Sequence, residues 1–392
     1  MTFSFIKPTL AELQSANLYR TRHAFSKSAG RNLVFAGQEY LNFSSNDYLG
    51  LNNHPLINAA FKQGVDDHGS GSSSSNLVTG YSAAHQYLEQ QLSEWLNAPR
   101  CLLFSTGFAA NSGLLSALGQ NRTTDYFLDK LSHASLIDGA FNANARSKRF
   151  RHNDSEHLQQ LLVKSTATDK LIIAEGVYSM DGDVAPLAQL NEQAIAQQSN
   201  LYIDDAHGIG VLGENGSGTL TAQNIDKNVH IIQMVTFGKA IATQGAAIAG
   251  SEELIEYLIN KCRDYIYSTA MPTANALATS ASIKLCQCEH WRREKILTLT
   301  DLFKCKLDKA VTITRSESSI IGILVGSEAN ALYCQQELQK LGIWLTAIRP
   351  PTVEMGKSRL RVTITSSHNS NDINLLAYNI NKVLTQCFSQ EK

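Results

Sequence analysis

The sequence predicts an α/β protein with a mostly parallel sheet in a large domain, followed by a smaller α+β domain at the C-terminal end. Between residues 46 and 286, short apolar runs alternate with helical stretches, which is the pattern of parallel strands buried on both faces. From residue 287 onward, a charged helix and a few further apolar runs follow. We therefore expect an N-terminal segment at 1–45, a large domain at 46–286 and a small domain at 287–392.

The first elements follow from local pattern. Residues 1–30 contain Leu10, Leu13 and Leu18 at spacings that predict a helix, and residues 34–43 predict a hairpin that turns at Gly37. A serine-rich run at 69–75 has the composition of a flexible linker, but its position inside an α/β unit favours a functional loop. The large domain then has apolar runs that predict strands at 101–104, 170–175, 201–204, 230–235 and 246–249.

The small domain begins after an amphipathic, charged helix predicted at 291–309. Apolar runs predict strands at 320–325, 343–347 and 359–365, with a helix at 328–341 between the first two. Strands mixed with helices at this spacing favour an α+β arrangement.

Composition excludes several classes of function. Among 392 residues, charged side chains make up 18% and the formal net charge is −1, so nothing in the charge favours nucleic acid or an anionic membrane as partner. The densest basic stretch, residues 146–151, is interpreted as a solvated helix end or loop. Seven scattered cysteines supply no tetrahedral metal set. Without a signal-peptide core or an apolar run long enough to span a membrane, we expect a cytoplasmic protein.

Chemically useful side chains follow two of the predicted strands. Asp204 ends one strand and His207 lies just beyond it, while Thr236 and Lys239 follow another. Carboxyl ends of parallel strands meet at one edge of a sheet, where ligands bind. An acid, an imidazole and an amine together suit pyridoxal 5'-phosphate, because the lysine forms an imine with it and the acid keeps its ring nitrogen protonated. Taken singly, each has an ordinary alternative: a surface lysine, a helix cap for Asp204 or Asp205, and a structural histidine.

Other segments supply candidate ligands for the same cofactor. Ser105 or Thr106 caps a predicted helix, whose free N–H groups favour a phosphate. His133 offers an imidazole that can stack on a planar ring. Glu175 and Ser179 follow a further predicted strand and can join the hydrogen bonds around the cofactor.

The motifs at 204–208 and 236–239 resemble those of the α-oxoamine synthases, pyridoxal-phosphate enzymes of the aspartate-aminotransferase fold, also called fold type I. The similarity extends from residues 41–50 to the last strand, and includes residues 265–272 and 346–353. It implies that Lys239 carries the cofactor, Asp204 pairs with the ring nitrogen, His207 contacts the ring oxygen and His133 stacks on the ring. It implies further cofactor contacts from Gly107, Phe108, Ser179, Thr236 and, across a homodimer with shared active sites, Ser268 or Thr269.

The resemblance also implies the substrates. Within the family, the segment 346–353 points to the members that condense L-alanine with a pimeloyl thioester, carried by coenzyme A or by an acyl carrier protein. Arg361 would bind the amino-acid carboxylate through its planar guanidinium, and Arg20, Asn46, His133, Arg349 and Thr352 would contribute to substrate binding. The serine-rich run replaces a glycine-rich one in relatives, which bears on acyl preference.

Two alternatives stay open from the sequence. One is an α-oxoamine synthase that uses glycine with acetyl-CoA, or serine with a long acyl thioester. The other is a nucleotide-binding α/β protein without pyridoxal phosphate, which leaves the grouping of Asp204, His207 and Lys239 without a purpose.

Overall fold

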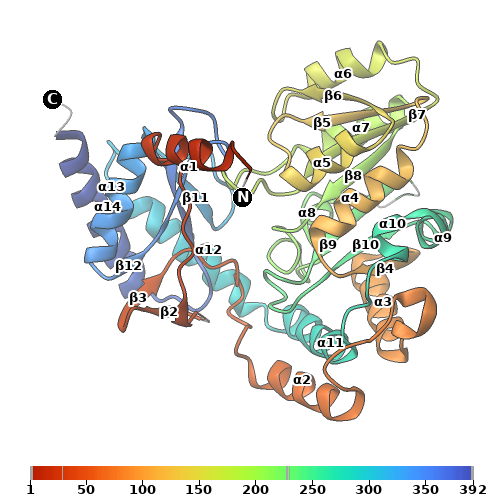
Figure 1. Cartoon of the computed structure of the whole chain (residues 1–392), viewed down its shortest axis with the longest axis horizontal. Coiled ribbons are helices and arrows are strands. Elements are labelled where there is room, and N and C mark those ends of the chain that lie inside the picture. The colour runs from red at the N-terminus through yellow and green to blue at the C-terminus, as the bar shows by residue number, and fades with distance from the viewer. Residues whose placement is uncertain (1–2, 29, 227, 229, 390–392) are drawn as a thin grey trace. The chain divides into compact units, whose positions relative to one another are not determined.

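In the computed structural model the chain forms two units, each with its own hydrophobic core (Figure 1). The structure describes residues 3–28, 30–226, 228 and 230–389. Unit 1 comprises residues 1–50, 179–183 and 291–392, and unit 2 comprises residues 51–178 and 184–290. The N-terminal segment therefore belongs with the C-terminal region, which differs from the expected division into three. The reason is that β3 (Gln38–Asn42) pairs in parallel with β12 (Ile343–Trp344).

Unit 2 is organised around one sheet, to which seven strands of the described residues contribute in the order β4-β10-β9-β8-β7-β5-β6. Neighbours from β9 to β6 run parallel, whereas β10 is antiparallel to both β4 and β9. The predicted strands and the mostly parallel sheet are thus confirmed. The strands are β4 (Arg100–Phe104), β5 (Thr124–Asp129), β6 (Arg146–Phe150), β7 (Asp169–Glu175), β8 (Asn200–Asp204), β9 (Ile231–Thr236) and β10 (Ala246–Gly250).

Alternate residues of these strands enter two separate cores, one on each face of the sheet. Tyr202 and its neighbours pack with α4 (Gly107–Leu118) and α5 (Ala134–Asn142). Leu201 and Ile203 pack with α6 (Ser155–Val163) and α7 (Leu187–Ala196) on the other face. This period of two explains the unbroken apolar runs in the sequence, because both faces are covered by helices.

The remaining helices of unit 2 surround this sheet or follow it in the chain (Figure 1). Their bounds are α2 (Pro55–His68), the π-helical turn η1 (Asn76–Gly80), α3 (Ala83–Leu96), α8 (Thr219–Ala222), α9 (Glu252–Lys261), α10 (Arg263–Ile266) and α11 (Thr273–Cys288).

The basic stretch at 146–151 is not the solvated helix end or loop that we expected. It forms the edge strand β6, and Arg146 and Lys148 both bind the buried carboxylate of Asp125 at 2.7 and 2.9 Å. Desolvation raises the pKa of Asp125, but hydrogen bonds from Ser165, Lys148 and Arg146 together lower it by more, so the net shift is downward. The positive charges on β6 therefore neutralise a buried carboxylate on the neighbouring strand β5. An edge strand can carry such charges because its outer side faces solvent.

The serine-rich run is an ordered segment. Ser75 forms a β-bridge with Thr269, Ala270 N–H donates to Ser74 O at 2.9 Å, and Ser72 Oγ donates to Ala270 O at 2.5 Å. A Cβ at Gly80 would lie 2.4 Å from Ser74 O, so this glycine allows the chain to turn back against the run. The run is therefore not a flexible linker, and the functional role expected of this loop stays a prediction.

Unit 1 contains two small sheets, ordered β1-β2-β3-β12 and β11-β14-β13 among its described residues. The run at 343–347, predicted as one strand, is two short strands, β12 and β13, which lie on either side of Leu345 and join different sheets. The elements are α1 (Ile6–Ser15), β1 (Phe25–Lys27), β2 (Asn32–Phe35), α12 (Trp291–Lys306), β11 (Ile320–Gly326), α13 (Glu328–Lys340), β13 (Thr346–Ile348), β14 (Ser358–Thr363) and α14 (Ser370–Ser389).

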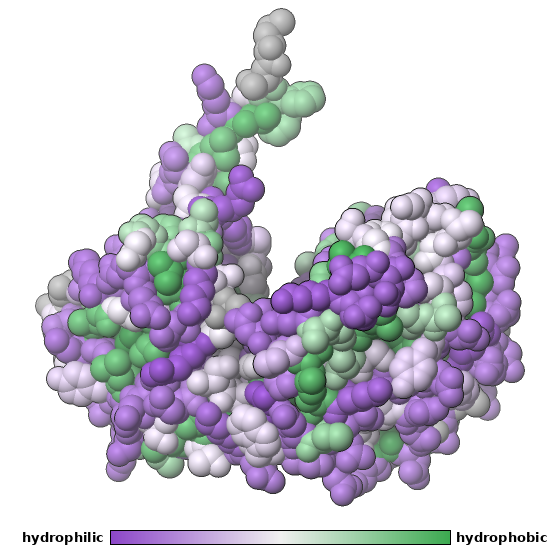
Figure 2. All heavy atoms as spheres, turned by 90° about the horizontal axis from the view of Figure 1, so that it is seen from below, coloured by the Kyte–Doolittle hydropathy of each residue, from purple (hydrophilic) through white to green (hydrophobic). Residues whose placement is uncertain are grey.

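The first helix and the residues just before it, the segment 3–15, carry exposed apolar side chains. Within α1 no residue is buried, and Phe3, Phe5 and Leu10 are 74%, 65% and 41% exposed. Figure 2 shows hydrophobic side chains along this segment. Among the described helices, none has the length and apolarity needed to cross a membrane.

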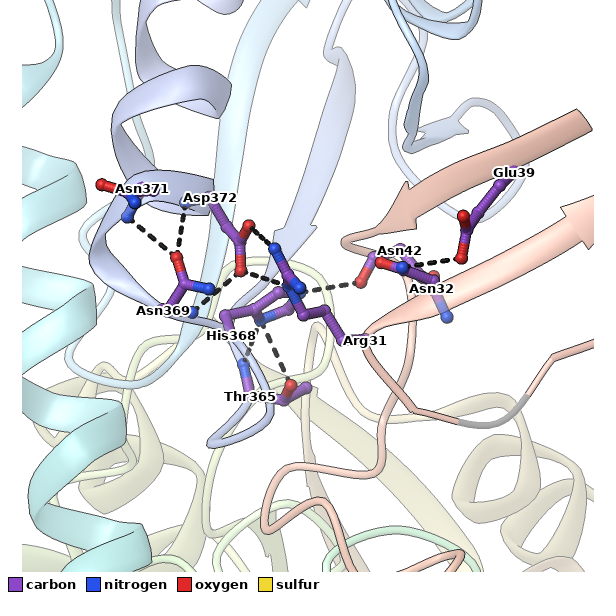
Figure 3. A network of polar contacts seen from close by, with 9 residues as sticks. All are labelled: Arg31, Asn32, Glu39, Asn42, Thr365, His368, Asn369, Asn371 and Asp372. Carbon is purple, nitrogen blue, oxygen red and sulfur yellow. Dashed lines mark hydrogen bonds and ion pairs between the residues drawn. The ribbon is translucent and has the colours of Figure 1, made fainter.

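Within unit 1, the buried His368 connects the C-terminal part of the chain to residues 42 and 43 of the N-terminal part (Figure 3). His368 has no exposed surface, and its ring stacks on Phe43 with centroids 4.3 Å apart. Its Nδ1 accepts from Thr365 N–H at 3.0 Å, so Nε2 carries the proton and donates to Asn42 O at 3.0 Å. Beside it, the Arg31 guanidinium binds Asp372 through two hydrogen bonds of 2.6 and 2.5 Å.

Because His368 is buried, we expect the stability of the folded protein to depend on pH. Burial lowers the pKa of His368 to about 4, whereas the unfolded chain takes up a proton there at about 6.5. The unfolded state therefore binds more protons below neutrality, and the free energy of unfolding should fall by about 2 kcal/mol from this group between about pH 7 and pH 5.

Urea-induced unfolding followed by circular dichroism measures the effect at the two pH values. The His368→Gln variant should be less stable at neutral pH but lose less on acidification. An equal loss in the wild type and the variant would contradict the assignment.

Candidate active site

Lysine, histidine and aspartate side chains meet at the carboxyl ends of β8 and β9 in unit 2. Asp204 is the last residue of β8, and Lys239 lies three residues beyond the end of β9. Because these strands are parallel neighbours, their ends reach the same edge of the sheet. Lys239 Nζ lies 2.8 Å from Nε2 of the buried His207, so the amine and the imidazole share a hydrogen bond.

Asp204 is a buried acceptor, with 5% of its surface exposed. One carboxylate oxygen accepts from Ala206 N–H at 3.0 Å and the other from Asn111 Nδ2 at 2.7 Å. Within the described parts of the chain, no cationic side chain is bonded to it. A buried carboxylate held by neutral donors suits a cationic ligand, and a protonated pyridine nitrogen is such a ligand.

Asn111 connects this carboxylate to two further buried side chains. Its Nδ2 also donates to Ser135 Oγ at 2.8 Å, and its Oδ1 accepts from Tyr202 Oη at 2.5 Å. The sequence interpretation assigned no role to these three residues. The sequence held a signal for two of them. Asn111 is a polar residue on the buried side of an apolar helix. Tyr202 precedes Asp204 by two positions on one strand, so the side chains of Tyr202 and Asp204 point to the same face of the sheet.

His133 lies at the start of α5 and caps it. Its Nδ1 accepts from Ser135 N–H at 3.2 Å, and its own backbone N–H donates to Glu175 Oε1 at 2.6 Å. Desolvation lowers the pKa of His133, with a smaller lowering from Lys239, although the residue keeps accessible surface. Burial raises the pKa of Glu175 well above its usual value, and the nearby Asp204 adds to the rise. Glu175 therefore bonds to the backbone of His133, and its participation in the hydrogen bonds around the cofactor stays a prediction.

The N-terminus of α4 provides free backbone donors next to β9. Thr106 caps this helix by accepting from Ala109 N–H at 3.1 Å, as one of the two predicted caps. A Cβ at Gly107 would lie 3.7 Å from Thr236 Oγ1, so the two predicted cofactor residues adjoin. The Thr236 hydroxyl itself donates to Gly245 O at 3.0 Å, and Phe108 is 48% exposed.

Ser268 and Thr269 lie in the same unit, where they line a small pocket together with Ser105. Thr269 forms the bridge to Ser75 described above. The serine-rich run therefore positions the segment that was expected to serve a neighbouring subunit.

Asp205, adjacent to Asp204, has a different environment. Its carboxylate has no exposed surface and accepts from Thr219 N–H, Thr219 Oγ1 and Gln233 Nε2 at 2.9, 2.7 and 2.8 Å. Thr219 is the first residue of α8, so Asp205 caps that helix from a distance in sequence. The alternative of a capping role therefore applies to Asp205.

Several predicted residues lie in unit 1. The buried Arg361 donates from Nε to Ser179 O at 2.6 Å and from Nη1 to Asn46 Oδ1 at 3.1 Å. Burial raises the pKa of the adjacent Tyr48 to about 12, an effect that Arg361 opposes. The structure thus groups three of the predicted residues, Arg361, Ser179 and Asn46, in one unit.

A pair of arginines, Arg20 and Arg349, lies elsewhere in unit 1. Arg349 donates to the carbonyl oxygens of Asn17 and Tyr19, and its carbonyl oxygen accepts from Thr352 N–H at 3.2 Å. Desolvation lowers the pKa of Arg349, and the positive charge of Arg20 lowers it further. Arg20, Arg349 and Thr352 are therefore neighbours, and the two like charges favour an anion between them.

The residues of unit 2 fit pyridoxal phosphate by their chemistry. They supply a buried carboxylate that suits a pyridinium, an amine that can form an imine, and an open helix N-terminus that suits a phosphate. Within the described ranges, no group of three or more histidine, cysteine or acidic residues is arranged to hold a metal ion.

Comparisons with known proteins agree with this chemistry. The family model described as aminotransferase class I and II matches residues 38–380. A relative from Saccharophagus degradans, named 8-amino-7-oxononanoate synthase, is 43% identical over 386 residues, which cover 98% of this chain and 97% of that protein.

Two solved structures are similar over most of the chain. A serine palmitoyltransferase variant from S. paucimobilis with a bound PLP–myriocin aldimine has a TM-score of 0.91 at 26% identity, covering 99% of this chain and 98% of that one. The 8-amino-7-oxononanoate synthase from Francisella tularensis has a TM-score of 0.76 at 28% identity, covering 89% and 99%. The predicted fold type I architecture and its cofactor are confirmed.

The two adjacent aspartates predict contrasting effects of one substitution. Asp205→Asn turns an amide N–H toward buried donors, so it should lower the free energy of unfolding by about 1–3 kcal/mol. Asp204→Asn removes the counter-charge for the ring nitrogen, so it should weaken pyridoxal phosphate binding about tenfold or more.

Thermal unfolding and titration of the apoprotein with the cofactor measure the two effects. Each variant serves as the control for the other. Equal losses of cofactor affinity in both variants would show that the two carboxylates are not distinct in role.

Proposed function

Because the chain belongs to the 8-amino-7-oxononanoate synthase family, within the class I and II aminotransferases, we propose that it condenses L-alanine with a pimeloyl thioester. The products are 8-amino-7-oxononanoate, carbon dioxide and the free thiol, as needed for biotin biosynthesis. The observation that carries the proposal is the hydrogen bond between Lys239 Nζ and His207 Nε2 beside the buried Asp204. The chain is thus an acyltransferase with pyridoxal phosphate as its cofactor.

Each cofactor ligand has a separate task in this proposal. Lys239 would hold the cofactor covalently, Asp204 would hold its ring nitrogen protonated, and His207 would orient its ring oxygen. The ring and phosphate contacts proposed in addition are His133, Gly107, Phe108, Ser179 and Thr236, with Thr269 or Ser268 supplied by a second copy of the chain. When bound, pyridoxal phosphate withdraws electrons from the Cα atom of the amino acid, which makes its proton removable.

Lys239 acts as the general base of the proposed reaction. Its amine removes the Cα proton of alanine, and the hydrogen bond to His207 holds Nζ in position for this transfer. His133 would donate a hydrogen bond to the thioester carbonyl oxygen while negative charge develops there. The deprotonated Cα atom of alanine bonds to the thioester carbonyl carbon, and the thiolate leaves and takes up a proton. Carbon dioxide is then lost from Cα, and a proton returns to Cα.

Arg361 is the proposed ligand for the alanine carboxylate. Its guanidinium is held by Ser179 O and Asn46 Oδ1, which fixes the direction of its remaining donors. Because Nε and Nη1 donate within the protein, the carboxylate would be bound through Nη2 in a charge-assisted hydrogen bond. Asn46 contributes by fixing the arginine.

The acyl preference is proposed from Arg20 and Arg349. Two neighbouring guanidinium groups favour a negative charge, and the pimeloyl chain ends in a carboxylate, whereas acetyl and palmitoyl chains do not. This observation favours pimeloyl transfer over the glycine- and serine-dependent reactions of related enzymes. Thr352, bonded to Arg349 through the backbone, would contact the same substrate.

We further propose that the enzyme works as a cytoplasmic homodimer. The uncovered apolar side chains of the segment 3–15 support a second copy as its cover. Either coenzyme A or an acyl carrier protein can present the thioester in this proposal, and a substrate assay with both carriers distinguishes them.

The decisive experiment is a product assay with alanine, glycine and serine against pimeloyl, acetyl and palmitoyl thioesters. Release of 8-amino-7-oxononanoate from alanine and the pimeloyl thioester supports the proposal. Faster condensation of another pair would replace it with the corresponding reaction.

Lys239→Ala predicts loss of both the imine and turnover. The variant should lack the yellow absorbance of the imine, should not be fixed to cofactor by borohydride, and should lose activity by at least about 10⁴-fold, which corresponds to about 5.5 kcal/mol. Absorbance spectra and the product assay measure these changes, with unchanged thermal unfolding as the control for folding. Full activity in this variant would refute the role of Lys239.

Arg361→Lys predicts a specific loss of alanine binding. Replacing the fork by one ammonium should raise the KM for alanine about 10-fold or more, at a cost of about 1.5–3 kcal/mol. Arg359→Lys is the matched control, because Arg359 lies on the same strand but forms an ion pair with Asp181. Steady-state kinetics with both variants should show the KM effect in the first alone.

A further inference from the structure

A continuous chain of hydrogen bonds runs from the buried carboxylate of Asp204 to His133, the N-cap residue of α5. Tyr202 Oη donates to Asn111 Oδ1, and Asn111 Nδ2 donates to both Asp204 and Ser135 Oγ at 2.7 and 2.8 Å. Ser135 Oγ then lies 2.8 Å from His133 Nδ1. Asn111 and Ser135 are 1% exposed, so water does not compete for these contacts.

The direction of every bond in this chain is fixed by chemistry. Both oxygens of Asp204 accept hydrogen bonds, so the amide of Asn111 must present Nδ2 to it, and a flipped amide would place Oδ1 against the carboxylate. The same Nδ2 has a second hydrogen, which Ser135 Oγ accepts. Tyr202 Oη closes the arrangement by donating to Oδ1. The amide is therefore used at three of its four hydrogen-bonding positions.

The hydroxyl of Ser135 connects the Asn111 amide to His133. Because Oγ accepts from Asn111, its own hydrogen is available to donate to His133 Nδ1. The backbone N–H of Ser135 also points to Nδ1, at 3.2 Å. Two donors that converge on one ring nitrogen require that nitrogen to carry a lone pair, so the proton of a neutral imidazole lies on Nε2.

We propose that Asn111 and Ser135 are positioning residues that couple Asp204 to His133 and hold His133 as the Nε2–H tautomer. The consequence for the reaction is that His133 presents a hydrogen-bond donor, rather than an acceptor, to the bound ligand. This step rests on the proposed function: the donor would stabilise negative charge on the thioester carbonyl oxygen during condensation. Asp204, the proposed partner of the cofactor ring nitrogen, would thereby also determine which ring nitrogen of His133 carries the proton.

Substitution at Asn111 tests the coupling. In Asn111→Asp, the new carboxylate accepts the Ser135 hydroxyl hydrogen, so Oγ presents a lone pair to His133. The proton should then shift from Nε2 toward Nδ1, against the one donor that remains there, the Ser135 backbone N–H. Ser135→Ala removes the hydroxyl donor but keeps the backbone N–H donor to Nδ1, so the share of the Nδ1–H tautomer should rise while the Nε2–H tautomer remains populated. The double variant should behave as Ser135→Ala alone, because residue 111 no longer reaches the ring.

Nitrogen NMR of holoenzyme labelled with ¹⁵N-histidine reads the tautomer directly. The His133 signals are assigned by their absence in His133→Gln. The wild type should show an unprotonated Nδ1, Asn111→Asp a protonated one, and Tyr202→Phe, the matched control that leaves both Nδ2 bonds in place, the wild-type pattern. A protonated Nδ1 in the wild type would overturn the proposal, as would an unchanged His133 in Asn111→Asp.

Kinetics add a second measurement. Asn111→Asp should lower kcat about 100-fold, the order expected when a positioned proton donor is lost, while the KM for alanine changes little. If Asn111→Asp does not fold, as judged by circular dichroism, Ser135→Ala decides, because an unchanged single tautomer there contradicts the coupling.

The product assay of the wild type separates this inference from the proposed function. Product from alanine and the pimeloyl thioester with a protonated Nδ1 would refute only the coupling. The expected tautomer without that product would refute only the function.

Discussion

The buried carboxylate of Asp204 is the constraint on which the rest of unit 2 depends. A negative charge at the end of an apolar strand is unfavourable without a partner, so its surroundings must supply donors from within the protein. Ala206 supplies one from the turn beyond the strand, and Asn111 supplies another from α4. Both donors are uncharged, so the carboxylate keeps its negative charge and can bind a cationic ligand. The orientation of the Asn111 amide follows from that requirement, and the proposed tautomer of His133 depends on it in turn.

The fold was largely predictable because its strands are covered on both faces. Unbroken apolar runs located β4, β7, β8, β9 and β10 within a residue or two. Two strands of the unit 2 sheet were missed. The buried β5 has acidic residues near both ends of a short apolar run, and the charges of the edge strand β6 bind Asp125 from a neighbouring strand and so look solvated in the sequence. The run at 343–347 was taken as one strand because periodicity does not show where a chain leaves one sheet for another.

The site was predictable where chemistry is concentrated in motifs. Asp204, His207 and Lys239 follow strands directly, and parallel pairing brings them together. Asn111, Ser135 and Tyr202 were not predictable as a group, because they come from a helix, a second helix and a strand, and each alone is an ordinary buried polar residue. Their connection is a property of side-chain geometry, which no spacing in the sequence records. The roles of residues in unit 1 likewise depend on contacts between distant segments, such as Arg361 with Asn46.

The pairing of β3 with β12 has a consequence for biosynthesis. Leu41 is opposite Ile343, so unit 1 needs both ends of the chain to complete its sheet. A ribosome adds about 5–20 residues per second, so the N-terminal hairpin must wait on the order of 15–60 s for its partner strand. Unit 2 is synthesised entirely within that interval. The hairpin therefore spends the time of translation as an unpaired edge, exposed to chaperones and to other nascent chains, while unit 2 already folds.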